Sequence, residues 1–228
     1  GVYDNTFDGV KVSYGDKVKG TAWYGKLTDS RINKDNPKAT DNPSDKAWGV
    51  GLAGDLGKNV TLFADYTSVK ADGDDWEYSL YDASQNQKTI FNDDKLNITD
   101  IGLKWKVAKD VKLTGAWLHT NAEDEENGWY AILDLWGASY KKPGSFGVQA
   151  VYYDEPVGAA LSHTMPMSYA GPKVKNGMFY DGFKGYSVGA SYTVAKNMMA
   201  TVTYYDLKGR VDSDYKTKSM WSEFQLRF

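Results

Sequence analysis

The sequence predicts an all-β protein, a transmembrane antiparallel β-barrel in which each strand pairs with the next along the chain. Three observations support this prediction. Segments that alternate apolar and polar residues recur along the 228 residues, and tight turns and long polar segments alternate between them. The composition is rich in Tyr (17), Trp (8) and Gly (23), with only 6 Pro. Barrels use Tyr and Trp at the membrane interfaces and small residues on crowded inner walls.

Composition excludes several other classes of protein. A formal net charge of −3 gives no basis for a nucleic-acid partner. The chain has no Cys, which excludes disulfides and thiolate metal sites but is compatible with a periplasmic or surface location. No apolar run is long enough for a transmembrane helix. The chain begins at Gly1 without Met or a signal peptide, so we expect a processed chain or a fragment.

The last ten residues form the most informative strand. Because side chains alternate along a strand, its two faces differ sharply in polarity. One face carries Met220, Ser222, Phe224, Leu226 and Phe228. The other carries Trp221, Glu223, Gln225 and Arg227. The first face must meet hydrocarbon and the second must meet water. An edge strand of a soluble sandwich would also explain this segment taken alone.

Four strands are predicted in the first third of the chain. Val10, Val12 and Tyr14 alternate with polar residues, and a turn at 15–16 leads into a second strand at 18–24. A polar segment follows at 30–46. The third strand, 48–55, alternates large apolar residues with small ones, and a tight turn connects it to the fourth, 60–67. The segment from about 70 to 95 is predicted as a polar loop.

Seven further strands are predicted in the rest of the chain. The strand at 101–107 has the cleanest alternation, and it returns as 111–117. The segment 129–140 is also a strand, but Asp134 breaks its alternation, so its faces cannot be assigned without a bulge. The longest loop is expected at 154–182. The remaining strands are predicted at 146–152, 186–194, 200–204 and 219–228.

Three tight turns share one pattern, a small residue followed by Lys and then Asn or Asp. They lie at 57–59, 108–110 and 195–197, and the pattern suits a hairpin with a positive φ near its tip. Short turns at one end of the strands and long loops at the other are typical of membrane barrels. A soluble sandwich with Greek-key crossings would mix both lengths at both ends.

The count of about eleven strands is odd, whereas an up-and-down antiparallel barrel closes with an even number. If the final strand descends to the periplasm, the first strand must also descend. We therefore expect that residues 1–228 are a single barrel domain that is incomplete at its N-terminus. An odd-stranded barrel closed by one parallel pair is the alternative.

Three stretches resemble a known family: 1–14, the hairpin at 102–110, and the final strand. They are similar to general bacterial porins, specifically the S-layer-homology-domain porins of diderm Firmicutes, the outer-membrane tethering type. The resemblance implies a homotrimer of sixteen-stranded barrels in the bacterial outer membrane, with this chain supplying strands six to sixteen. The wall-binding S-layer-homology domain would lie upstream of Gly1. Phe224, Leu226 and Phe228 would then form the signal that the barrel-assembly machinery reads.

Charged residues on the polar faces are candidates for the lining of a water-filled pore. The alternative is a wall of mutually paired charges with no narrow point nearby. Lys104, Lys106 and Lys112 are expected to form a vestibule patch near a periplasmic turn. The complete candidate set is Lys11, Lys19, Asp65, Asp100, Lys104, Lys106, Lys112, Glu223 and Arg227.

The sequence gives little basis for an enzyme or a metal site. Only His119 and His163 could act as a general base, and the adjacent Ser162 is poorly placed to bond with His163. An Asp/Glu–His pair between His119 and the acidic run at 123–126 remains open. The run at 72–75 lacks the spacing of a calcium loop.

The sequence therefore predicts a passive diffusion porin for small hydrophilic solutes and ions, in contact with outer-membrane lipid and without a cofactor or metal. A non-conducting structural barrel or adhesin is the alternative. A barrel enzyme is the least favoured.

Overall fold

The computed structural model describes residues 7–28, 44–70, 76–81, 87–93, 95–159, 182–210 and 216–228. They form one antiparallel sheet of eleven strands, each hydrogen-bonded to its neighbour along the chain, and a separate two-stranded sheet. The described residues include no helix that is long and apolar enough to cross a membrane. The eleven strands are β1 (Phe7–Tyr14), β2 (Val18–Thr28), β3 (Ser44–Leu56), β4 (Val60–Lys70), β7 (Lys95–Ala108), β8 (Val111–Thr120), β9 (Asn127–Trp136), β10 (Phe146–Glu155), β11 (Phe183–Ala195), β12 (Met198–Gly209) and β13 (Lys216–Leu226).

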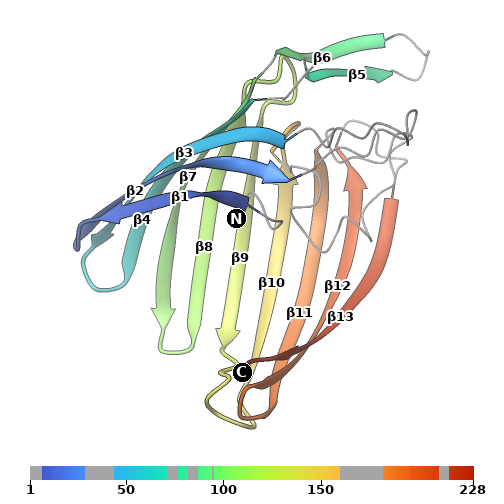
Figure 1. Cartoon of the computed structure of the whole chain (residues 1–228). Coiled ribbons are helices and arrows are strands. Elements are labelled where there is room, and N and C mark those ends of the chain that lie inside the picture. Colours follow the sequence, from blue (N-terminus) through green and yellow to red (C-terminus); the bar gives the residue numbers. More distant parts are fainter. Residues whose placement is uncertain are drawn as a thin grey trace.

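The predicted all-β, up-and-down arrangement is confirmed. Figure 1 shows the sheet curved into a trough, with short turns such as those of β7–β8 and β11–β12 at one end of the strands. The longer connections lie at the opposite end. We call these the turn end and the loop end. Each strand from β1 to β13 pairs with the next, and the two register shifts lie at the turn end, between Lys106 and Ala108 and between Thr193 and Ala195. Away from these shifts, the face of one residue on a strand determines the faces of the others on that strand.

The two faces of the sheet differ in burial. Large residues on one face, among them Val50, Leu103 and Val188, are exposed, whereas Phe63 and Tyr205 on the other are buried. A single curved sheet covers only its concave side, so the buried face is the concave one. We call the concave side the inner face and the other the outer face. The sequence-based faces of 101–107 and 186–194 agree with this assignment.

The sheet is open. Within the described residues β1 pairs only with β2, and β13 pairs only with β12. The first and eleventh strands of an antiparallel sheet run in the same direction, so they could pair with each other only in parallel. Within the described residues β1 therefore has one unpaired edge, and closure of the sheet into a barrel stays a prediction.

The prediction for 129–140 was wrong in two respects. The strand ends at Trp136, where the backbone turns to a φ of 60°. Asp134 does not break the alternation, because it pairs in regular register with Gln149, whose Nε2 donates to Asp134 Oδ1 at 2.8 Å. The irregular residue is Ile132, an apolar side chain on the inner face. Tertiary contacts with a buried cluster, described below, explain its position.

The segment 70–95 was predicted as a loop but contains a hairpin. β5 (Trp76–Tyr81) and β6 (Gln87–Asp93) pair with each other and not with the main sheet. The alternating Trp76, Tyr78 and Leu80 of the sequence carried this signal, but the polar composition of the segment as a whole outweighed it.

The predicted positive φ occurs in two of the three tight turns. Gly57 has a φ of 75° and Asn197 a φ of 66°. The turn of β7 and β8 has no residue with a positive φ, although a register shift between Lys106 and Ala108 precedes it, as one between Thr193 and Ala195 precedes the turn at Asn197.

Candidate pore wall

Of the nine charged residues predicted to line a pore, eight lie on the inner face of the sheet. Their strands range from β1 to β13, and the register places each of the eight at an inner position. Arg227 directly follows the last residue of β13. Asp100 is half-buried and the other eight are exposed. Within the described residues no ion pair joins Lys11 or Lys19 to a carboxylate, and the same holds for Lys104, Lys106 and Lys112. Lys112 nevertheless stands directly opposite Asp134 of β9, so the alternative of a wall of mutually paired charges stays open.

Three lysines gather near the turn end of the inner face, where the vestibule patch was expected. Lys106 pairs directly with Lys112, and Lys104 pairs with Thr114 one inner position further from the turn. Like charges placed directly opposite each other are destabilising unless water screens them. All three side chains are exposed, which provides that screening.

Two carboxylates face each other in the middle of the inner face. Asp65 on β4 pairs directly with Asp100 on β7. The Tyr130 hydroxyl, which reaches across β8, donates to Asp100 Oδ2 at 3.2 Å, while Asp100 Oδ1 has no hydrogen-bond partner among the described residues. Sequence reasoning missed Tyr130 because the faces of its strand had not been assigned. This acidic pair is the feature of the wall best placed to attract cations.

Small residues make room for these side chains, as the composition predicted. A side chain at Gly51 would overlap the Asp65 carboxylate, and one at Gly102 would approach the Phe63 ring to 2.6 Å. Phe63 in turn lies under Lys104, whose Nζ is 5.2 Å from the ring centroid. The inner wall is thus crowded, and its glycines allow large side chains to lie across the neighbouring strand.

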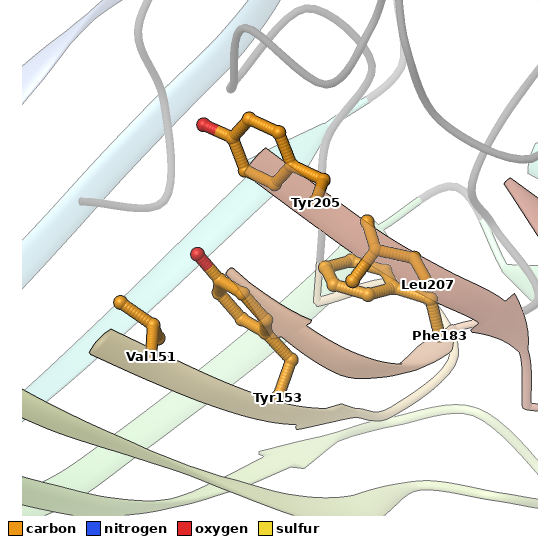
Figure 2. Close-up of a cluster of buried hydrophobic side chains, with 5 residues drawn as sticks. All are labelled: Val151, Tyr153, Phe183, Tyr205 and Leu207. Carbon is orange, nitrogen blue, oxygen red and sulfur yellow. The ribbon is translucent and has the colours of Figure 1, made fainter. Parts of the chain in front are cut away.

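Nearer the loop end the inner face becomes aromatic and apolar. Figure 2 shows five buried side chains on the same side of β10, β11 and β12, with the two tyrosine hydroxyls directed away from Phe183. The Tyr153 hydroxyl lies 3.1 Å from Ser187 Oγ. The sequence contains a sign of this cluster, because its apolar and aromatic members occupy positions on the otherwise polar face of their strands. They are Val151, Tyr153, Phe183, Tyr205 and Leu207.

The segment 137–145 holds the end of the last strand. The Arg227 guanidinium lies 3.6 Å from the centroid of the Tyr140 ring, and the Tyr140 hydroxyl donates to Gln225 Oε1. The Asn197 N–H donates to the Tyr140 carbonyl at 2.8 Å, and the Arg227 N–H donates to the Asn197 carbonyl at 3.0 Å. Arg227 is therefore a charge at the turn-end rim whose position is fixed by an aromatic ring.

The proposed assembly signal lies on the outer face. Phe224 and Leu226 are exposed at outer positions of β13, opposite Ala200 and Met198, and Phe228 lies beyond the last strand residue. This placement leaves the three side chains accessible, and their role in assembly stays a prediction.

An aromatic row crosses the outer face toward the loop end. Trp129 stacks on Tyr152 with ring centroids 5.0 Å apart, and Trp48 lies 5.4 Å from Tyr66. From one strand to the next, the row member is displaced by about one residue on average from the residue directly opposite its predecessor. Such a displacement is expected for the tilted strands of a barrel. Its members are Tyr24, Trp48, Tyr66, Trp117, Trp129, Tyr152, Tyr186 and Tyr204.

On the turn side of this row the outer face of the eleven strands carries no charged residue. Leu52, Leu62, Leu103 and Val202 are typical, and Ser222 is the most polar member. On the loop side of the row, the next outer position is charged on five of the strands, at Lys26, Lys46, Asp154, Lys184 and Asp206. The outer face is thus free of charge over this length, while charged side chains such as Lys104 and Asp65 lie on the inner face over the same length.

The residues considered for catalysis or metal binding do not form a site in the described part of the chain. His119 is on the outer face, where its ring stacks on Trp117 at 5.5 Å and its Nδ1 lies 3.1 Å from Asn127 Oδ1. The acidic run at 123–126 supplies it with no partner. Ser162, His163 and the segment 72–75 lie outside the described residues, which contain no group of three or more His, Asp or Glu able to hold a metal ion.

No protein-family model and no curated protein matches this chain. Its function is therefore inferred from the geometry of the sheet and the chemistry of its two faces.

Proposed function

We propose that this chain forms the larger part of the wall of a diffusion porin, a passive channel for small hydrophilic solutes and ions in the bacterial outer membrane. One observation carries the proposal. The outer face is free of charge between the aromatic row and the turns on all eleven strands, while the inner face over the same length carries exposed Lys and Asp side chains. Such a wall separates hydrocarbon from water, and aromatic residues are enriched at that boundary.

Transport would proceed by size exclusion with a modest electrostatic bias. The paired carboxylates of Asp65 and Asp100 would attract cations in the middle of the wall, and Lys104, Lys106 and Lys112 would favour anions near the turn end. Diffusion through a water-filled lumen needs no cofactor and no conformational cycle.

The open edges require further strands. Unpaired amides in hydrocarbon cost several kcal/mol each, so β1 and β13 cannot both face lipid. Because these two strands run in the same direction, an odd number of added strands would close an antiparallel barrel. Five would give the sixteen that the porin resemblance implies. A homotrimer and a tether to the cell wall are proposed on that resemblance alone.

A second candidate is a non-conducting structural barrel or adhesin. The aromatic cluster that contains Tyr153 and Phe183 favours it, because apolar side chains on the inner face leave less room for water at the loop end. The two candidates share the same wall and differ in whether the lumen conducts.

Recordings from planar bilayers test the proposal. Protein extracted from the membrane with all of its strands should give stepwise currents, whereas residues 1–228 refolded alone should give no stable channel because two edges stay unpaired. Protein that inserts fully but never conducts would favour the structural barrel. Stable channels formed by residues 1–228 alone would contradict the account of the open edges.

A further inference from the structure

Three neighbouring strands of the inner face differ from the rest of the wall. On β10, β11 and β12, the inner positions within 147–153, 185–193 and 199–207 hold no charged residue. Each of the other eight strands has at least one charged inner residue, such as Asp65 on β4 or Asp134 on β9. The middle of the uncharged region presents hydroxyl and amide groups, with an indole beside them. We call five of these residues the hydroxyl patch: Gln149, Ser191, Thr201, Thr203 and Trp221.

The register brings the members of the hydroxyl patch together. Ser191 stands directly opposite Thr201, and Thr203 stands directly opposite Trp221. Gln149 is opposite Gly189, which on its other side is opposite Thr203. The patch therefore extends over four neighbouring strands, which is about 14 Å at the usual spacing of strands in a sheet. That length is comparable to a short oligosaccharide.

The hydroxyl groups of the patch keep hydrogen-bonding capacity for a solute. Ser191 Oγ and Thr201 Oγ1 lie 2.9 Å apart, so one hydroxyl donates to the other. Because a hydroxyl has one donor and two acceptor lone pairs, this pair can still donate one hydrogen bond and accept several. A side chain at Gly189 would come within 2.8 Å of Thr203 Oγ1, so the glycine leaves space beside that hydroxyl. The three hydroxyl residues are half-buried, and Gln149 is exposed.

This chemistry suits a neutral solute with many hydroxyl groups. A charged solute meets no charge of either sign at these positions, whereas each hydroxyl of a sugar can donate to or accept from the Ser, Thr and Gln side chains. The half-buried Trp221 packs against the cluster of Tyr153 and Phe183, and its indole is the kind of flat apolar surface that the C–H face of a sugar ring contacts. Glu223 borders the patch opposite Thr201, and its carboxylate is a further acceptor for solute hydroxyls.

We propose that the hydroxyl patch is a binding site for neutral sugars, which cross the lumen along β10, β11 and β12. The inference rests on the proposed function, since it requires a water-filled lumen, and it names a class of solute for that lumen. Ions follow the charged residues of the remaining strands, so the two kinds of solute use different sides of the same wall. Binding is weak, because water competes for every hydrogen bond at an open surface.

Block of the ion current by a sugar tests the site. Protein extracted from the membrane with all of its strands is recorded in a planar bilayer in potassium chloride while maltotriose is added. We expect the current to fall and then to reach a plateau as the patch fills. A polyethylene glycol of similar mass has hydroxyl groups only at its ends, so it should lower the current without a plateau.

Two matched double variants locate the effect. Ser191→Ala/Thr201→Val removes the facing hydroxyls of the patch with little change in shape. It should raise the half-blocking concentration of maltotriose roughly fivefold, the factor expected for one lost hydrogen bond. Ser13→Ala/Thr21→Val makes the same change on the inner face of β1 and β2, where Ser13 Oγ and Thr21 Oγ1 lie 3.2 Å apart. It should leave the half-blocking concentration unchanged, and the ion current through each variant shows that it is folded.

The possible outcomes separate the sugar site from the porin proposal. A conducting channel that maltotriose does not block, or an equal response of both double variants, would overturn the sugar site and leave the porin proposal intact. Protein that inserts fully but carries no ion current would overturn both.

Discussion

Deletion of Phe228 should sharply reduce the amount of protein inserted into the outer membrane of cells, while the stability of the inserted protein falls only modestly. Phe228 is fully exposed beyond the end of β13 and pairs with no other strand residue. In lipid its loss would remove roughly 2–3 kcal/mol of apolar burial from a wall built of many such residues. The protease-resistant fraction in isolated membranes measures insertion, and the midpoint of urea unfolding measures stability.

A substitution earlier in the same strand provides the control. Met220 is also exposed at an outer position, opposite Tyr204, and Met220→Ala removes apolar surface of similar size without altering the C-terminus. Its insertion should stay near that of the unmodified protein. Equal insertion of the Phe228 deletion and the unmodified protein would contradict both the assembly role and the outer-membrane location.

Neutralising the acidic pair should produce the largest change in ion preference. Asp65→Asn/Asp100→Asn removes two facing carboxylates from the middle of the inner wall without changing side-chain size. A unit charge about 4 Å from an ion in water is worth on the order of 1 kcal/mol, which is roughly fivefold in local cation concentration. The reversal potential of the closed barrel under a potassium chloride gradient should therefore shift toward that of an anion-preferring pore.

Neutralising the lysines near the turns serves as a control, because it should shift the ion preference in the opposite direction. Lys104→Gln/Lys106→Gln/Lys112→Gln should shift the reversal potential toward cation preference, and by less, because these exposed side chains lie where screening is strong. If neither set of substitutions moves the reversal potential while single-channel currents persist, ions do not pass along this wall.

Much of the sheet could be predicted from the sequence because one face of each strand is consistently free of charge. In 101–107 the alternation of Leu103 and Trp105 with Lys104 and Lys106 determines the faces without any knowledge of neighbouring strands. The same local signal placed eight of the nine candidate wall residues on one face. The high glycine content also predicted small residues on the inner wall, such as Gly51 beside the Asp65 carboxylate and Gly102 beside the Phe63 ring.

Features that depend on pairing between distant residues could not be predicted. Ile132 interrupts the polar face because it packs against a cluster from β10, β11 and β12, and no local pattern reveals that contact. Tyr140 was assigned to a strand, although its contacts with Gln225 and Arg227 hold it in the segment after β9.

Site-directed spin labelling at two adjacent residues tests the central claim, that this sheet separates lipid from water. The chain contains no cysteine, so Leu103→Cys and Lys104→Cys would each give a single label on β7, on the outer and inner face respectively. In a bilayer, the label at 103 should collide mainly with oxygen, which is lipid-soluble, and the label at 104 mainly with a water-soluble nickel chelate. Similar accessibility of both labels to both reagents would contradict the assignment of the two faces and, with it, the porin wall.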